Sequence, residues 1–128
     1  MDAEELLEQA SQEGLTYLPK QRKFISPALQ AAVSKFGAKK VQTQLTPERI
    51  RSIINATRTN YRNIKRICDT TQDPSYCYMS EAILPYLESA SEEFEQGLNI
   101  AKPLKIYRID ENNNLGDELL EIHRPRDY

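Results

Sequence analysis

The sequence marks the start of a helix three times with the same pair of residues, a capping side chain followed by proline. The pairs are Ser26-Pro27, Thr46-Pro47 and Asp73-Pro74. Such a cap accepts a hydrogen bond from the first turn, and proline suits the first helical position because an N–H there would have no intrahelical partner. Together with Asp2, a further cap near the N-terminus, these pairs predict a mainly α-helical fold, a small bundle of four to five helices.

Apolar residues recur at helical spacing after each of these starts. The helices predicted from this spacing cover residues 2–14, 26–37, 46–69 and 73–97. The third has the longest apolar stripe, about six turns without a breaker. The fourth contains Pro85 and is expected to kink or break there. The segments 15–25 and 38–44 are expected to be irregular connectors.

The last part of the chain changes character. Residues 104–109 are β-branched and aromatic, residues 110–114 supply turn-forming side chains, and residues 115–122 can form a return strand or a short helix. We favour a β-hairpin packed on the helices. The prediction is one helical domain over residues 1–128, in which 102–128 form a β-hairpin or an extended tail.

The sequence predicts a cytoplasmic protein with no cofactor, no metal and no membrane partner. No apolar run approaches the ~18–20 residues of a membrane span, and residues 1–5 lack the basic and apolar regions of a signal peptide. Cys68 and Cys77 have no CxxC neighbour, and because His123 is the only histidine, the chain cannot supply the usual zinc ligands. We therefore expect both cysteines to be reduced and buried.

The residues also give no support for catalysis. No nucleophile has an evident base, since the one histidine, His123, lies in the tail next to Arg124. The phosphate-loop, dinucleotide-binding and zinc-protease motifs are absent. The adjacent carboxylates of Glu92 and Glu93 lie on a charged helix with no concave site in prospect. We expect the protein not to be an enzyme.

Most of the positive charge lies in one segment. From Lys20 to Arg66 the chain has twelve basic residues and one acidic residue, Glu48, a formal charge of +11 in a chain whose net charge is −2. Residues 1–19 hold five acids and no base, and residues 67–128 hold thirteen acids and five bases. The field of such a segment reaches ~8–10 Å. A phosphate backbone or an acidic protein surface is its natural partner.

Four of these cations line up beside the apolar face of the third predicted helix. They are Arg51, Arg58, Arg62 and Lys65, here called the basic stripe. They fall within a sector of about 60°, and the stripe is ~21 Å long, comparable to about six stacked nucleotides. A solvated face normally mixes charge signs, and here only Glu48 is available. We expect phosphate contacts; the alternatives are an acidic protein, the acidic residues 81–95 of the same chain, or plain solvation.

The candidate nucleic-acid-binding residues are the basic stripe and the cations around it. They are Arg51, Arg58, Arg62, Lys65, Arg66, Lys39, Lys40, Lys20, Arg22 and Lys23. Three aromatic residues, Tyr17, Phe24 and Tyr61, lie among them and could stack bases, as in single-strand binders. Core packing is the favoured role for Phe24 and Tyr61, and the role of Tyr17 is left open.

One short motif in this region resembles a known family. The segment from Leu45 to Arg51 (LTPERIR), running into Ile53, Ile54 and Tyr61, is similar to the helix start L-T-x-x-x-[IL]-R in small helical subunits of CRISPR effector complexes of the Cascade or type III kind. The resemblance implies a non-catalytic subunit for antiviral defence that stacks in copies along a guide–target duplex. Only Arg51 of the candidates lies in the motif, and the β-like tail departs from the all-helical pattern of that family.

These observations predict a non-catalytic subunit of a ribonucleoprotein effector complex. It would bind the backbone of RNA or DNA, as a single strand or an RNA–DNA duplex, without sequence preference. The apolar content of 39% is below the usual ~45–50%, which favours contacts with copies of itself and with larger protein subunits. The alternative is an interaction or inhibitor protein whose basic face docks on an acidic protein.

Overall fold

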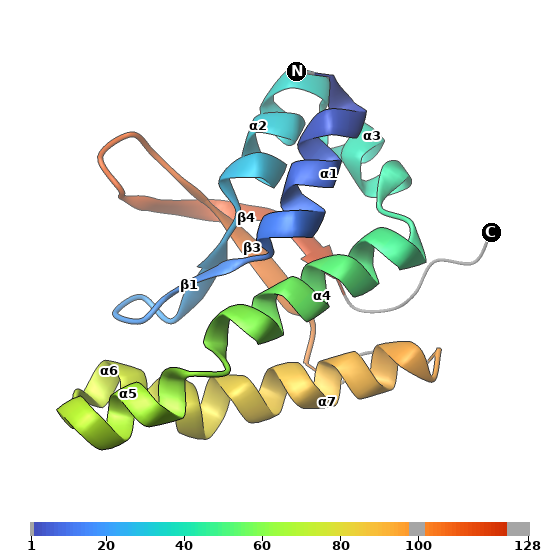
Figure 1. The fold of residues 1–128 in the computed structure, drawn as a ribbon. Coiled ribbons are helices and arrows are strands. Elements are labelled where there is room, and N and C mark those ends of the chain that lie inside the picture. The colour runs from blue at the N-terminus through green and yellow to red at the C-terminus, as the bar shows by residue number, and fades with distance from the viewer. Residues whose placement is uncertain (1, 98–101, 123–128) are drawn as a thin grey trace.

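The computed structural model describes residues 2–97 and 102–122. Its helical segments are α1 (Ala3–Glu13), α2 (Pro27–Phe36), α3 (Ala38–Gln44), α4 (Pro47–Tyr61), α5 (Ile64–Thr71), α6 (Pro74–Tyr78), the π-helical turn η1 (Met79–Ile83) and α7 (Leu84–Glu95). Its strands are β1 (Thr16–Leu18), β2 (Lys23–Ile25), β3 (Leu104–Ile109) and β4 (Leu115–Ile122). Helix α4 is central, with α1 packed on one side and α7 on the other (Figure 1).

The helix starts follow the caps expected from the sequence. The Ser26 hydroxyl accepts a hydrogen bond from the N–H of Leu29 at 3.2 Å, and the Thr46 hydroxyl accepts one from Arg49 at 3.2 Å. The Asp73 carboxylate accepts one from Ser75 at 2.9 Å. At the N-terminus, Asp2 and Glu5 form a capping box. These starts are local, because each cap bonds to a residue two or three positions further on.

The two expected connectors are instead regular structure, which corrects the sequence analysis. Residues 16–25 contain β1 and β2, and residues 38–44 form α3. β2 pairs antiparallel with β1 and parallel with β3, so that its second partner comes from the far end of the sequence. Helix α3 is held by burial of Val41, whose side chain is fully inaccessible to solvent. In both segments, tertiary contacts stabilise a regular structure that local propensity alone does not favour.

The third helix is shorter than predicted, because the chain turns at Arg62 and Asn63 and divides it into α4 and α5. Tyr61, the last residue of α4, is buried, and its hydroxyl accepts a hydrogen bond from the N–H of Tyr17 in β1. The turn lets α5 pack on α6 and η1. Ile64 at its start is buried as well, so both sides of the turn are anchored in the core.

The helix is irregular near Pro85, where a kink or a break was expected, but it continues through a π-helical turn and does not break. The π-helical turn η1 directly precedes α7, and Pro85 occupies the first turn of α7. Proline lacks an N–H and its ring crowds the carbonyl four residues earlier, here that of Glu81. The wider π turn accommodates this crowding without ending the helical path.

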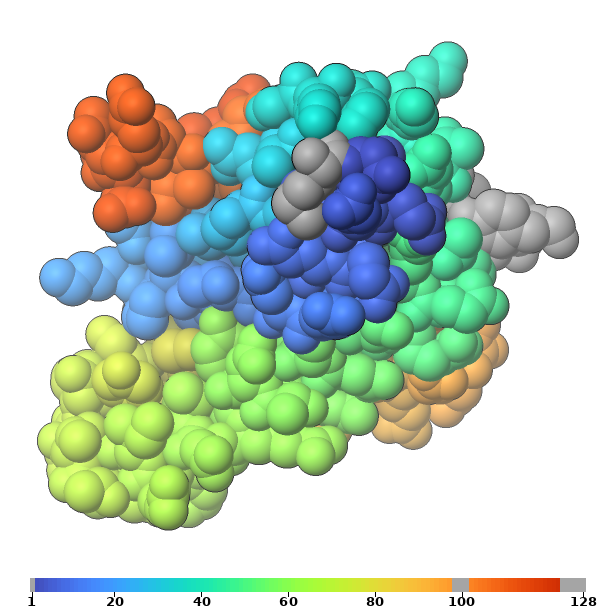
Figure 2. All heavy atoms as spheres, turned by 45° about the horizontal axis from the view of Figure 1, so that its top comes forward, coloured from blue at the N-terminus to red at the C-terminus, as the bar shows by residue number. Residues whose placement is uncertain are grey.

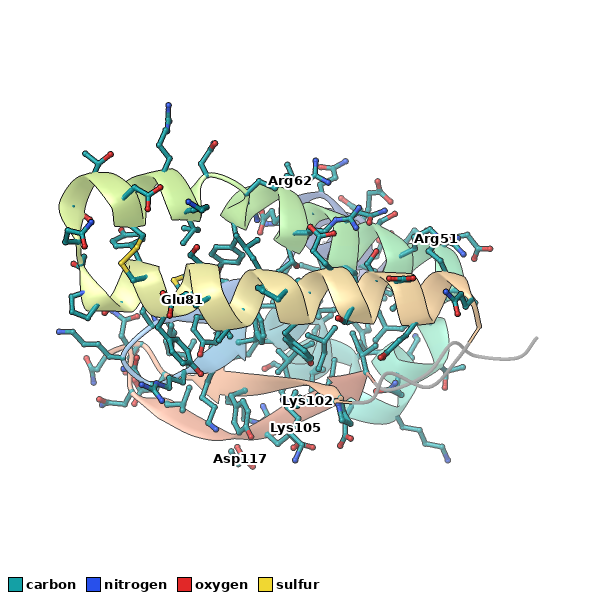
Figure 3. The ribbon with its side chains drawn as sticks, turned by 90° about the horizontal axis from the view of Figure 1, so that it is seen from below. Arg51, Arg62, Glu81, Lys102, Lys105 and Asp117 are labelled. Atoms are coloured by element: carbon teal, nitrogen blue, oxygen red, sulfur yellow. A yellow bond between two sulfur atoms is a disulfide. The ribbon has the colours of Figure 1, made fainter. Side chains whose placement is uncertain are left out.

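Cys68 in α5 and Cys77 in α6 form a disulfide, so the prediction of reduced cysteines is wrong (Figure 3). Their Cα atoms are 4.8 Å apart because α5 and α6 form a tight helical hairpin. Both residues are only half-buried. A spacing of nine residues does not reveal such a hairpin, which depends on the turn before Asp73.

The fold is mainly α, as predicted, and the C-terminal β3–β4 hairpin is confirmed. The hairpin belongs to a four-stranded sheet in the order β1-β2-β3-β4. Among the described residues, no helix combines the length and apolar character needed to cross a membrane.

The junction between α1 and β1 is fixed on α4 by two close contacts. Gly14 has a φ of +73°, and a Cβ at this position would lie 2.6 Å from the backbone nitrogen of Thr57. The next residue, Leu15, donates its N–H to the buried hydroxyl of Thr57 at 2.8 Å. Glycine is therefore required here for both conformation and space.

Candidate nucleic-acid interface

Two members of the basic stripe face carboxylates of α7. The Nε of Arg51 donates to Oε1 of Glu95 at 2.5 Å. The Nη1 of Arg58 lies 3.2 Å from both Oε2 of Glu88 and Oγ of Ser91. For these two arginines, the structure has the arrangement named above as an alternative, in which the acidic residues 81–95 neutralise the cations of α4.

Arg49 beside the stripe is held in the same way. Its guanidinium pairs with Glu4 of α1, and only 16% of its side chain is exposed. The corresponding value for Arg58 is 23%, and its Nε is buried without a hydrogen-bond partner among the described residues. Half-buried arginines with fixed partners join α4 to α1 and α7, so their first role is to hold helices together.

The other members of the stripe lie beyond the bend between α4 and α5. Arg62 and Arg66 are exposed, and neither makes an ion pair within residues 2–97 and 102–122. Lys65 pairs with Asp69 at 3.1 Å on the surface of α5. Because the helix bends at Arg62, these side chains do not continue a straight ladder from Arg51.

The remaining candidates occupy two separate places. Lys39 and Lys40 are exposed on α3, far from α5 (Figure 1), and the Nζ of Lys40 lies 5.1 Å from the centre of the Phe36 ring. Lys20 and Arg22 lie in the turn between β1 and β2. Figure 2 shows this turn and the tip of the β3–β4 hairpin projecting on the same side of the molecule. The structure thus divides the predicted interface into three surfaces.

One of these surfaces borders a cavity of about 310 Å³ between the sheet and the segment from α6 to α7. We call it the basic–aromatic pocket. Its cations are Arg22, Lys23, Lys102 and Lys105. Its aromatic residues are Tyr17, Phe24, Tyr78, Tyr86 and Tyr107. Among the described residues that line it, none is aspartate or glutamate.

Two of the cations rest on tyrosine rings. The guanidinium carbon of Arg22 lies 4.2 Å from the centre of the Tyr78 ring, and the Nζ of Lys23 lies 5.1 Å from that of Tyr107. Such contacts are worth ~0.5–1 kcal/mol at exposed sites. A hydrogen bond between a cation and a phosphate is stronger than such a contact. An anionic ligand can therefore draw both cations away from the rings.

The two lysines from the C-terminal part of the pocket differ in their surroundings. Lys105 lies 3.7 Å from a carboxylate oxygen of Glu118 on β4, and both side chains are about half exposed. Lys102 is exposed and makes no ion pair in the part of the chain that the structure describes. Both line the cavity on the strand side of α7, whereas Arg51 and Arg62 lie beyond the opposite side of this helix (Figure 3). Among the described residues, the pair of Lys105 with Glu118 is the only ion pair that the four cations of the pocket make.

Two phenol groups of the pocket, those of Tyr17 and Tyr86, stay protonated over the physiological range. Burial, together with a hydrogen bond to Tyr78, raises the pKa of Tyr17 to about 12. Burial and the charge of Glu93 raise the pKa of Tyr86, whose hydroxyl donates to the backbone oxygen of Lys102 at 2.6 Å. The ring of Tyr17 also packs edge-on against that of Phe24, with centres 5.0 Å apart. The hydroxyls of Tyr17 and Tyr86 are thus held by hydrogen bonds, and Tyr17 and Phe24 are buried in the core, the role favoured for Phe24 from the sequence.

The sequence analysis identified part of this pocket and missed the rest. Arg22 and Lys23 were among the candidates, and Tyr17 was the aromatic residue left open. Lys102, Lys105, Tyr78, Tyr86 and Tyr107 were not singled out. One signal was present on β3, where Lys105 and Tyr107 alternate with the buried residues Leu104 and Ile106 and so share the opposite face.

No protein-family model, no curated protein and no solved structure shows a significant match to this chain.

Proposed function

We propose that the protein is a non-catalytic binder of single-stranded nucleic acid and that the basic–aromatic pocket is its binding site. The observation that carries the proposal is the combination of four cations and three part-exposed tyrosines, Tyr78, Tyr86 and Tyr107, around one cavity that has no carboxylate among the described residues of its lining. Tyr17 and Phe24 also line it, but they are buried in the core and stack no base. Cations contact phosphates, and rings stack bases, which is how single-strand binders work without reading sequence. A duplex hides its bases and suits this pocket less well.

The basic stripe has a smaller part in this proposal than in the sequence analysis. Arg51 and Arg58 are already paired with α7, so a phosphate would have to compete with Glu95 and Glu88. Arg62 and Arg66 remain open to a strand that leaves the pocket along α5. Their contacts would be sequence-independent and sensitive to salt.

Assembly with copies of itself and with larger subunits of a ribonucleoprotein complex stays part of the proposal. It rests on the resemblance of residues 45–61 and on the low apolar content. A cytoplasmic location is at odds with the Cys68–Cys77 disulfide, because disulfides persist mainly in oxidising compartments. Trapping of free thiols in a fresh cell extract decides this point: a trapped Cys68 or Cys77 supports the cytoplasm, and a protected pair contradicts it.

A second candidate is an acidic protein partner. Tyrosine and arginine are enriched at protein interfaces, and the pocket presents four tyrosines and Arg22. An acidic loop could enter the cavity as a strand would. Nucleic acid remains the better fit because flat bases can use several rings at once.

The test is fluorescence anisotropy with labelled single strands of RNA and DNA and a duplex of the same length. We expect dissociation constants of ~10⁻⁴–10⁻⁶ M at physiological salt for the single strands and weaker binding of the duplex. The Lys102→Ala/Lys105→Ala variant should bind at least ~10-fold more weakly, with a salt slope reduced by about 1.4. Lys39→Ala, an exposed lysine on α3, is the matched control and should bind like the unmodified protein.

Two results would contradict the proposal. One is the absence of binding to any of the strands at low salt. The other is equal binding by the pocket variant and the control variant. If the unmodified protein instead captures an acidic peptide and the pocket variant does not, the second candidate replaces the first.

A further inference from the structure

The basic–aromatic pocket continues into a second cavity along α7. This cavity has a volume of about 370 Å³, and its lining shares Ala82, Tyr86 and Lys102 with the pocket. Beyond these residues it is lined by Ser89 and Glu93, among others. The two cavities therefore adjoin each other, with Tyr86 and Lys102 at their border, and we call the pair the groove.

The two ends of this groove differ in charge. The first is lined by four cations, and the second by the carboxylate of Glu93, the hydroxyl of Ser89 and, at the border with the first, Lys102. Glu93 lies close enough to Tyr86 for its charge to help raise the pKa of that phenol, so the carboxylate is near the junction. A carboxylate at this position repels a phosphate and accepts hydrogen bonds from amino and imino groups. The groove thus suits a ligand that is anionic at one end and neutral and polar at the other.

The volume and charge of the first cavity indicate which anionic group it can bind. A volume of about 310 Å³ is at the lower limit of small-molecule sites, ~300–1,000 Å³, and leaves room for one nucleotide unit rather than several. Two carboxylates among the described residues stand against these four cations, Glu118 beside Lys105 and Glu93, which lines the second cavity with Lys102, so the formal surplus is 4 − 2 = +2. This surplus exceeds the single charge of a phosphodiester and is close to that of a phosphomonoester, which carries about −1.5 to −2 at neutral pH.

We propose that the groove binds a nucleoside phosphomonoester, either the phosphorylated end of a strand or a free nucleotide. The phosphate lies among Lys23, Lys102 and Lys105, and the base stacks at Tyr86 with its polar edge toward Ser89. This inference rests on the proposed function and names its substrate. A second phosphate, as in the interior of a strand, would fall near Glu93 and is disfavoured.

The experiment compares five ligands by calorimetry with the full-length protein. They are a nucleoside 5′-monophosphate, the corresponding nucleoside, inorganic phosphate, and one short oligonucleotide with and without a 5′-phosphate. We expect the phosphorylated oligonucleotide to bind at least ~10-fold more tightly than its unphosphorylated form. The nucleotide should bind more tightly than either the nucleoside or inorganic phosphate, because it alone contacts both ends of the groove.

Two variants localise the effect. Lys102→Ala should remove most of the preference for the phosphorylated end, whereas Lys39→Ala should keep it. Glu93→Gln removes the negative charge with little change in shape and should raise the affinity for unphosphorylated strands, so that the preference shrinks. Circular dichroism of each variant checks that the fold is kept.

The outcomes separate this inference from the proposed function. Equal binding of the two oligonucleotides overturns the end-specific site and leaves single-strand binding intact. Binding of the mononucleotide without binding of either oligonucleotide supports the nucleotide site and overturns strand binding. If inorganic phosphate binds as tightly as the nucleotide, the groove is only an anion-binding site and the inference is overturned.

Discussion

The α4–α7 face and the basic–aromatic pocket are both rich in cations, but the cations have different neighbours. On the α4–α7 face, Arg51 and Arg58 meet the carboxylates of α7. In the pocket, Arg22 and Lys23 meet the rings of tyrosines. The first arrangement uses positive charge within the fold, and the second leaves it available to an anion. A count of charges along the sequence therefore locates basic segments, whereas the neighbours of each cation decide which segment can bind a ligand.

Mutations in the two regions should therefore have different effects on stability and on binding. Removing a cation of the α4–α7 face, above all the part-buried Arg58, should reduce stability and spare binding, because its hydrogen bonds to α7 are lost. Removing a cation of the pocket should reduce binding and spare stability, since exposed cation–π contacts contribute little. Stability and binding are both measured in the first three predictions below, and the last concerns the pH dependence of stability.

The largest effect is expected for charge reversal in the pocket. The Lys102→Glu/Lys105→Glu variant replaces two attractive charges with two repulsive ones, so its affinity for a single strand should fall by about 100-fold or more at low salt. Its free energy of unfolding should fall by no more than about 1 kcal/mol, because both positions are exposed and the ion pair that is lost, Lys105 with Glu118, lies on the surface. Anisotropy and urea denaturation measure the two quantities. A large loss of stability would show that these lysines support the fold, as the arginines of the α4–α7 face do, and would contradict the difference between the two regions.

The disulfide should have the next largest effect, and it tests how the two faces are linked. It joins α5, which carries the end of the basic stripe, to α6, which carries Tyr78. A loop of this length should contribute about 2–3 kcal/mol to the free energy of unfolding. Because Tyr78 follows Cys77 directly, reduction should also weaken strand binding by a few-fold. Urea denaturation and anisotropy with and without a phosphine reductant measure both.

The control for that experiment is the Cys68→Ser/Cys77→Ser variant. It should resemble the reduced protein and show no response to the reductant. If reduction changes neither stability nor affinity, the disulfide does not support the wall of the pocket.

A smaller effect is expected on the α4–α7 face. Arg58→Met keeps the apolar stem but loses the contacts with Glu88 and Ser91, and we expect a loss of about 1–2 kcal/mol in the free energy of unfolding. Strand affinity should change by less than about two-fold. Arg62→Met is the matched control, because Arg62 is exposed and should give a change within about 0.5 kcal/mol. A large loss of affinity in Arg58→Met with unchanged stability would return the binding site to the basic stripe.

The smallest effect concerns pH. The phenol of Tyr17 has its pKa raised to about 12 in the folded protein by burial and by a hydrogen bond to Tyr78, against an ordinary value of 10.0. Between about pH 10 and 12 the unfolded chain loses this proton and the folded chain keeps it, so stability falls as the pH rises through this window. Denaturant unfolding between about pH 9 and 12 should show the decline.

The Tyr17→Phe variant is the comparison for this measurement. It should decline less steeply over the same pH window because it lacks the shifted phenol. A curve identical to that of the unmodified protein would show that other groups cause the decline.

The helix starts could be read from the sequence because their physics is local. Asp2, Ser26, Thr46 and Asp73 each bond to a backbone N–H within three residues. The strands β1 and β2 could not be read in the same way. The partner of β2 on one side is β3, roughly 80 residues further along the chain, and no local pattern in residues 15–25 announces it.

The same distinction holds for the candidate site. Arg22 and Lys23 stood out because they belong to a basic segment, and the possible neutralisation of the stripe by residues 81–95 was recognised as an alternative. The pocket itself needs β3 beside β2, which brings Lys105 and Tyr107 to Lys23. The site depends on a contact between distant segments, and the periodicity within a single segment does not predict that contact.

The parallel pairing of β2 with β3 also has a consequence for biosynthesis. A chain leaves the ribosome from its N-terminus, so the helices between these strands can form while β2 still has a free edge. Contacts between residues far apart in sequence close slowly, and the register of Phe24 with Ile106 should be among the last to form. The walls of the pocket come from the beginning, the middle and the end of the described chain. A nascent chain that stops at residue 97 therefore has helices and charge but no groove, and the ability to hold a ligand arises in the final step of folding.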